Sequence, residues 1–451
     1  MIRTAIAGIT ALMAVLLVAP SGGRAEAQAI RPPVLETTGN NAGDNAVIRP
    51  REKLTVDRCV QVALRNSPNI LSASHTVNAT RSRVGQAWSG YYPQITFTGS
   101  YVSRDTALPG ALNTDTTVRQ DGYVGTGALT QNIIDFGKTG TQVSIRQKDL
   151  DASREDLRDA TGLIVFNVKS AYYGLLRAEK SRNVLRETVA LFEKQLEVAR
   201  GFFEAGERSK FDVTNAEVEL SNQKLNLVRA ENALRIARVT LNNAMGVPKA
   251  PEYTIEDTLS FQKYAITLEE ASDRAFLNRP DIRSAAARRE SAEGSLSLAR
   301  KGYLPTLSGN ANYTRGGGTY YLEPDSWSVG VTLTIPFFSG FLTTHQVGEA
   351  KENLGTVRAN EEALQQNVLL TVQQVYIKLQ EAEERLGVAE LTVKQAEENY
   401  ELAHGRYEEG VGSPIEETDA LVKLSNARLN VVAALADYKV AEAELQKAMG
   451  E

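Results

Sequence analysis

Two acidic residues near the carboxyl end of the chain have the spacing of a charged constriction. Glu416 and Asp419 are three residues apart, so on a helix they share one face. In a symmetric oligomer each position becomes a ring of like charges, which selects cations and can bind a multivalent ion. A second interpretation is local, because Asp212 and Glu416, or Ser209 and Ser413, can serve the positively polarised first turn of the helix that follows them.

Groups for catalysis or metal binding are scarce. The 451 residues include one cysteine, Cys59, and three histidines far apart in sequence, His75, His345 and His404. We expect no internal disulfide and no His-rich metal site, with Cys59 as a small apolar residue of the first helix and the histidines without a role in a site. There is no serine-hydrolase, metalloprotease or P-loop motif, and the net charge of −5 argues against nucleic acid as a partner. The sequence therefore predicts neither an enzyme nor a cofactor.

The first 53 residues are expected to lie outside the main fold. A short basic start, an apolar run over 4–19 and A-x-A sites ending at Ala27 or Ala29 predict a secretory signal peptide over 1–27. A membrane anchor is the alternative, although this apolar run is short for a spanning helix. Residues 28–53, rich in Pro, Gly, Asn and Arg, predict an extended lead-in.

The rest of the chain contains two copies of one plan. The segment Asn66-Ser-Pro68 returns as Asn278-Arg-Pro280, and Gly90-Tyr-Tyr-Pro93 returns as Gly302-Tyr-Leu-Pro305, both at an offset of 212. Farther along the chain the offset falls to 204, so one loop of the first copy has eight extra residues and is expected to be an exposed hairpin tip. We predict repeat 1 over 54–246, a linker over 247–265 and repeat 2 over 266–451.

Each repeat is expected to begin with one helix, but long helices dominate both repeats. We expect them over about 137–205 and 341–409, each followed by a turn and a further helix, over about 212–246 and 416–449. Their apolar residues recur in steps of three and four, which is typical of left-handed coiled-coil packing. At 1.5 Å per residue each long helix would extend roughly 90 Å. A coiled-coil rod, such as a periplasmic tether or an adhesin stalk, is the alternative that this pattern alone leaves open.

Strands of alternating polarity favour a membrane protein over that rod. They are expected over about 93–102 and 122–134 in repeat 1 and about 305–314 and 325–338 in repeat 2. About ten alternating residues is the length of a strand in a transmembrane barrel, although a half-buried soluble sheet has the same alternation. Aromatic residues flank both strand pairs, as they do at membrane interfaces: Trp88, Tyr91, Tyr92 and Phe136 in repeat 1, and Tyr303, Phe337, Phe338 and Phe341 in repeat 2.

Four strands are too few to close a barrel. Open sheet edges would leave backbone N–H and C=O groups unpaired in hydrocarbon, and the usual minimum for closure is about eight strands. Two chains would make a narrow barrel filled with side chains, whereas three would make twelve strands around an open lumen. The polar inner faces and the export signal favour three chains, with the helices hanging inward as a second, helical barrel.

The ordered set of motifs over 54–450 resembles the TolC family of outer-membrane efflux proteins. The tandem repeat, the N-x-P break, the G-Y-x-P junction and the tip patterns Phe203-Glu-Ala-Gly206 and Tyr407-Glu-Glu-Gly410 carry the resemblance. It implies a mainly α fold with a transmembrane β-barrel portion, in which a trimeric twelve-stranded β-barrel is continuous with a twelve-helix coiled-coil α-barrel. It also implies a passive, gated conduit in the outer membrane of a Gram-negative bacterium, extending into the periplasm.

The resemblance further implies partners and roles for the turns. The partners would be a periplasmic adaptor protein and an inner-membrane pump of the RND, ABC or MFS type, in efflux or in type I secretion. The periplasmic gate of the family is matched here by Glu416, Asp419, Asp212 and Tyr407. Gly412 stands where the best-studied type has a basic linking residue, so the sequence does not decide whether the resting latch between Tyr407 and Asp212 is present. The adaptor would contact the two turns: Gly206, Glu207, Arg208, Ser209, Gly410, Val411, Gly412 and Ser413.

Overall fold

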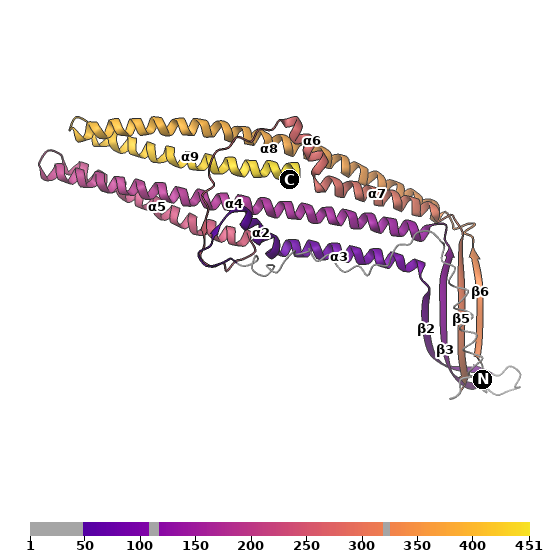
Figure 1. Ribbon diagram of the computed structural model, residues 1–451. Helices are drawn as coiled ribbons and strands as arrows, with labels where there is room; N and C mark the ends of the chain where they lie inside the picture. The colour runs from indigo at the N-terminus through magenta and orange to yellow at the C-terminus, as the bar shows by residue number, and fades with distance from the viewer. Residues whose placement is uncertain (1–47, 108–116, 319–324) are drawn as a thin grey trace. The chain divides into compact units, whose positions relative to one another are not determined.

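The computed structural model of the chain describes residues 48–107, 117–318 and 325–451 (Figure 1). The predicted signal peptide and the lead-in up to residue 47 lie outside the described residues, as do residues 108–116 of the longer loop. Among the described helices, none combines the length and the apolar character needed to cross a bilayer.

Both repeats have the same order of elements. Repeat 1 contains the helices α2 (Val56–Asn66), α3 (Pro68–Trp88), α4 (Lys138–Glu204) and α5 (Lys210–Ala244), with the strands β2 (Gln94–Ala107) and β3 (Thr117–Ile134) between α3 and α4. Repeat 2 contains α6 (Leu268–Asn278), α7 (Pro280–Lys301), α8 (Leu342–Glu408) and α9 (Pro414–Met449), with β5 (Thr306–Gly318) and β6 (Asp325–Thr334) between α7 and α8. The short strands β1 (Lys53–Leu54) and β4 (Thr254–Ile255) pair in parallel.

The prolines of the N-x-P motifs mark a helix boundary in each repeat. Pro68 opens α3 and Pro280 opens α7, each at the first helical position. Proline is tolerated there because the first turn has no intrahelical use for its missing N–H. The helix expected at the start of each repeat is therefore two consecutive helices.

The strands differ in length from the sequence prediction. β2 reaches Ala107 and β3 begins at Thr117, several residues beyond the predicted limits, because the backbone ladder continues through polar residues. β6 ends at Thr334, four residues before the predicted end at 338. Pro336 follows shortly after and has no N–H to donate to a ladder.

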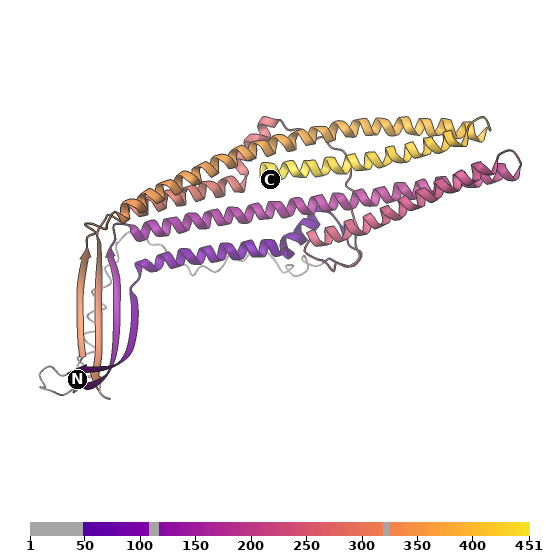
Figure 2. The same cartoon turned by 180° about the vertical axis from the view of Figure 1, so that it is seen from behind.

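The long helices pair as two antiparallel hairpins. α4 and α8 have 67 residues each, and α4 packs against α5 while α8 packs against α9 (Figures 1 and 2). α3 and α7 both pack along α4, and α7 also contacts α8. Many contact positions are alanine, which lets the helices approach closely; the buried ones include Ala199, Ala216, Ala382, Ala389, Ala427 and Ala434.

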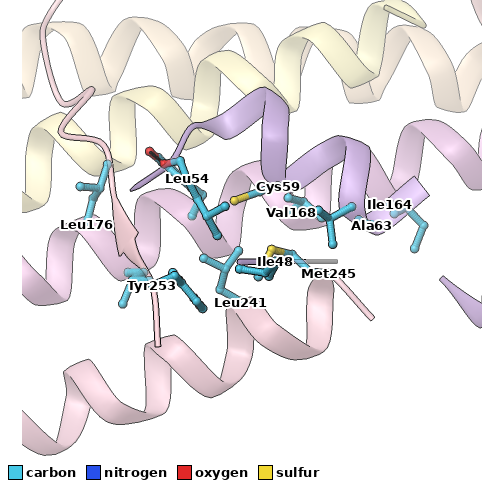
Figure 3. Close-up of a cluster of buried hydrophobic side chains, with 13 residues drawn as sticks. Ile48, Leu54, Cys59, Ala63, Ile164, Val168, Leu176, Leu241, Met245 and Tyr253 are labelled. Carbon is cyan, nitrogen blue, oxygen red and sulfur yellow. Dashed lines mark hydrogen bonds between the residues drawn. The ribbon is translucent and has the colours of Figure 1, made fainter. Parts of the chain in front are cut away.

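A buried cluster holds the base of the first hairpin. Figure 3 shows its side chains converging from α2, α4 and α5, with Cys59 and Met245 among them. Cys59 has no exposed surface, and burial raises the pKa of its thiol to about 12. The buried hydroxyl of Tyr172 donates to the carbonyl oxygen of Glu256 at 2.7 Å. Cys59 is thus a small apolar core residue, since a protonated, enclosed thiol is unreactive.

The four long strands form one antiparallel sheet in the order β2-β3-β5-β6. Gln94 lies opposite Thr130 in the first hairpin and Thr306 opposite Thr334 in the second. β3 and β5 join the two repeats, with a register irregularity between Asn132 and Ile134. Within the described residues β2 and β6 each have one neighbouring strand, so both edges of the sheet are open.

The apolar side chains of this sheet lie on its surface. Phe97 is 81% exposed and Trp327 is 76% exposed, and every residue of β6 is exposed. A half-buried soluble sheet would cover one face with another layer, which is absent from the described part of the chain. Within the described residues, the sheet therefore remains an uncovered surface.

Candidate functional site at the helical turns

The turns that connect α4 to α5 and α8 to α9 have the same backbone design. Gly206 has φ +76° and Gly410 has φ +77°, a left-handed conformation that glycine adopts without strain. The N–H of Gly206 donates to the carbonyl of Phe203 at 3.0 Å, and the N–H of Gly410 donates to that of Tyr407 at 3.0 Å. Both long helices thus end in the same closure.

The local interpretation of the turn residues is that they cap the helix that follows. Of the two serines, one does so. The hydroxyl of Ser413 accepts the N–H of Ile415 at 3.3 Å and caps α9, whereas Ser209 makes no side-chain cap on α5. Asp212 and Glu416 lie in the first turns, where the helix dipole favours a carboxylate. The dipole account therefore still fits both carboxylates.

The two carboxylates predicted to form a ring have basic neighbours. Asp419 Oδ2 lies 2.5 Å from Lys423 Nζ, and Glu416 Oε2 lies 3.8 Å from Arg406 Nη2. All four side chains are more than half exposed, so these pairs contribute little to stability. They nevertheless make the local charge mixed. The pair of Asp419 and Lys423 has the i,i+4 spacing of an ion pair on one helix, a signal present in the sequence.

Tyr407 contacts the first hairpin through its ring. It is buried, stands edge-on to Phe202 with 5.8 Å between ring centroids, and has the guanidinium of Arg208 5.8 Å above it. Burial raises the pKa of its phenol. In the described part of the chain no hydrogen bond joins Tyr407 to Asp212, although Asp212 is close enough to raise the pKa of the phenol, and the resting latch stays a prediction.

A basic link between the turns comes instead from Arg208. Its Nη2 donates to the carbonyl oxygen of Gly412 at 3.0 Å and, more weakly, to that of Gly410 at 3.4 Å. Gly412 is required at its position, since an added Cβ would lie 2.8 Å from the backbone nitrogen of Tyr407. The sequence placed Arg208 in the turn, but its contact depends on how the two hairpins pack.

A buried carboxylate lies beside the turn of the second hairpin. Glu417 is 2% exposed, its Oε1 lies 2.6 Å from Nδ1 of His404, and its Oε2 accepts from Nε2 of Gln195 at 3.2 Å. Burial raises the pKa of Glu417 despite the lowering effect of His404. His404 thus pairs with a buried carboxylate, a contact that the sequence does not predict. The three residues come from α9, α8 and α4, so no local sequence pattern announces them.

The predicted interface aromatics lie at the helix–strand junctions. All are at least partly exposed, Phe337 almost completely at 99%. Phe136 and Phe341 have positive φ, and each adjoins a glycine in the same conformation, Gly137 or Gly340. A bulky residue in this region is strained, so both junctions hold aromatic rings in a defined, costly geometry.

No group of three or more potential metal ligands occurs among the residues that the structure describes. The site is therefore a set of charged and aromatic contacts between two hairpins. Such an arrangement can hold the hairpins together or release them. It places no nucleophile beside a base, which acyl-transfer chemistry would need.

The family model, the relatives and the solved structure that match this chain are all described as outer membrane proteins or channels. The family model described as outer membrane efflux protein matches residues 59–247 and 271–451. The chain is 24% identical over 402 residues to the outer membrane protein TolC of Vibrio cholerae serotype O1, covering 86% of this chain and 89% of that protein. It is 25% identical over 313 residues to the outer membrane efflux protein BepC of Brucella suis biovar 1, covering 68% and 65%. The solved CmeC outer membrane channel of Campylobacter jejuni has a TM-score of 0.77 at 19% identity, covering 88% of this chain and 85% of that one.

Proposed function

This chain belongs to the outer membrane efflux protein family, and we propose that three copies of it form the outer-membrane channel of a tripartite export system. The observation that carries the proposal is the four-stranded sheet with two open edges and exposed apolar side chains. Hydrocarbon cannot satisfy the backbone groups of an open edge, so a lipid-facing sheet must pair its edges with neighbours. β6 of one copy would pair with β2 of the next.

The number of copies follows from the lumen. Three sheets give twelve strands, enough for a barrel with an open interior, whereas two give a barrel that side chains fill. The polar face of the sheet suits a water-filled lumen; on it the hydroxyls of Thr126 and Thr314 lie 3.3 Å apart, and the amide of Asn310 donates to Thr332 at 3.0 Å.

Exposed apolar stripes on the helices support a matching helical wall. α5 exposes Val218, Leu225, Val228, Ile236 and Val239, which recur at helical spacing. α8 exposes Ile377, Val388, Leu391 and Leu402. Apolar stripes of this length are seldom left in water, so we assign them to contacts between neighbouring copies. Three pairs of hairpins would then continue the barrel as a twelve-helix tunnel.

The turns form the far end of that tunnel in this proposal. Arg208 ties the two hairpins of one copy together, and Glu416 and Asp419, with their basic neighbours, contribute a ring of mixed charge at the constriction. The exposed turn residues, Glu207, Ser209 and Val411 among them, suit contact with a periplasmic adaptor. The adaptor would connect the channel to an inner-membrane pump. The type of pump, RND, ABC or MFS, would differ with the compound exported.

The experiment compares two arginine substitutions on β6 in planar lipid bilayers. Val331→Arg places a charge on the apolar face, which costs about 2–4 kcal/mol at the bilayer midplane, so it should abolish stable trimers and conductance. Thr332→Arg, its neighbour on the polar face, should still form trimers and only alter conductance. A wild-type chain that stays a water-soluble single subunit, with no ion flux, would refute the proposal.

A further inference from the structure

We propose that Glu417, held between His404 and Gln195, is a proton-dependent tie between the two helical hairpins, and that mild acid strengthens it. The inference rests on the proposed channel, because the tie matters where separation of the hairpins widens the tip. It concerns residues apart from the Arg208 link and apart from the exposed carboxylates Glu416 and Asp419.

The geometry places Glu417 across the boundary between the hairpins. Its partner Gln195 belongs to α4, and the same amide nitrogen also donates to the hydroxyl of Thr418 on α9 at 2.9 Å. Leu421, one turn after Glu417, is buried in a cluster with Phe192 and Leu196 of α4. Moving the second hairpin away from α4 would therefore break both hydrogen bonds and expose the carboxyl to water.

The Gln195 amide can hydrogen-bond to Glu417 in either protonation state of the carboxyl. Gln195 Oε1 is buried and has no hydrogen-bond partner among the described residues. A buried polar atom without a partner is costly. A protonated Glu417 has an O–H to donate, and a 180° flip of the Gln195 amide would present its oxygen to that donor. The flip would place the amide nitrogen where the oxygen had no partner, so protonation removes the buried charge of the carboxylate while the hydrogen bond between Glu417 and Gln195 is kept.

The charged and titratable surroundings of Glu417 come mainly from α8. His404 lies against it and has Glu408 3.3 Å from its other ring nitrogen, and the phenols of Tyr400 and Tyr407 are close enough for Glu417 to raise their pKa values. From α4 the facing group is the uncharged amide of Gln195. Beyond Tyr407, the α4–α5 turn contributes Arg208 and, at longer range, Asp212.

The sign of the pH effect follows from burial. With the hairpins joined, the pKa of Glu417 is raised above its ordinary value, chiefly because the carboxylate loses water. With the hairpins separated, the carboxyl is hydrated and its pKa falls back. The joined arrangement therefore binds the proton more tightly, so acid favours it, and this advantage disappears as the pH rises through the raised pKa.

Two measurements on the full chain test this tie between pH 5 and pH 8. The first is conductance of the trimer in planar bilayers, and the second is the distance between spin labels at Glu197→Cys on α4 and Glu401→Cys on α8, for which buried Cys59 need not be replaced. In the wild type we expect conductance to rise with pH and the label distances to broaden. Each unit of difference in pKa corresponds to about a tenfold change in the equilibrium.

Glu417→Gln and Glu398→Gln form the matched pair of variants. Glu417→Gln stands in for the protonated carboxyl, so it should remove most of the pH dependence and keep the distances narrow at pH 8. Glu398→Gln removes the same charge from an exposed site on α8 and should follow the wild type. An unchanged slope in Glu417→Gln, or flat wild-type distances, would overturn the tie. Conductance that is absent at every pH would count against the proposed channel alone, since the distances report on the tie without it.

Discussion

The two helical turns share a backbone but divide their charged contacts unequally. Gly206 and Gly410 close both long helices in the same conformation, as the 204-residue offset requires. At that offset, however, Arg208 corresponds to Gly412 and Val213 to Glu417. The first turn supplies the cation that reaches across, and the second supplies the backbone acceptor and the buried carboxylate. The two repeats thus share the backbone conformation of the turn, while the contacts between the two hairpins depend on the residues in which the repeats differ.

Giving the second turn the arginine of the first should have the largest effect. In Gly412→Arg the new Cβ meets backbone atoms of Arg406 and Tyr407 at 2.9 Å or less, and backbone cannot yield as a flexible side chain does. We expect overpacking to cost about 1–3 kcal/mol, and the melting temperature of the trimer to fall accordingly. Gly206→Ala is the useful contrast: its Cβ meets open space, so its cost is the left-handed conformation alone. Equal melting temperatures for Gly412→Arg and the wild type would contradict the assigned packing.

Giving the first turn the carboxylate of the second should be nearly as damaging. Val213 packs against the cluster of α4 and α5, and the matching residues do not include a histidine, because Arg200 stands where the second copy has His404. Val213→Glu should cost about 1–3 kcal/mol at pH 7 and less at pH 4, because burial penalises the charged form. Chemical denaturation at the two pH values measures this. A penalty independent of pH would mean that position 213 is solvated.

Removing the crossing cation should loosen the tip without unfolding it. Arg208→Gly copies the residue of the second turn and deletes the hydrogen bonds to the carbonyls of Gly410 and Gly412. Both hydrogen bonds lie at the partly exposed tip, where water can replace them, so we expect a several-fold rise in resting conductance with little change in melting temperature. Arg208→Lys keeps the charge and loses the fork, and should fall between the two. Resting conductance equal to that of the wild type would exclude Arg208 as a tie.

The exposed carboxylates should give the smallest effect. Asn215 occupies the position in the first copy that matches Asp419, so only the second copy brings this charge to the constriction. Because Lys423 neutralises it locally, removing Glu416 and Asp419 together should weaken block by a trivalent cation by a few-fold in planar bilayers. Lys423→Ala should strengthen the block. If the trivalent cation blocks the conductance of the double alanine variant as strongly as that of the wild type, the ring does not bind the ion.

The fold could be predicted where it depends on periodicity. Steps of three and four specified the helices and alternation specified the strands, whereas the division of the first helix of each repeat at the N-x-P proline was not predicted. Those patterns are local, and each residue reports on its own element. The open sheet edges were also predictable, since four strands can be counted in the sequence.

The contacts at the tip could not be predicted in the same way. Gln195 and Glu417 are 222 residues apart, and Arg208 meets Gly412 only because two hairpins pack side by side at one particular rotation. A heptad pattern fixes which face of a helix is buried but not which polar residue at its margin meets which neighbour. Three scattered histidines predict no metal site, and no sequence spacing predicts that His404 pairs with the carboxylate of Glu417.

In the proposed channel one chain supplies a third of the barrel, and two neighbouring copies complete it. Native mass spectrometry of the detergent-extracted wild-type complex tests it most directly. We expect a single species of three chains, because the edges of β2 and β6 and the apolar stripes of α5 and α8 would find their partners between neighbouring copies. A predominant species of one chain under the same conditions would contradict it.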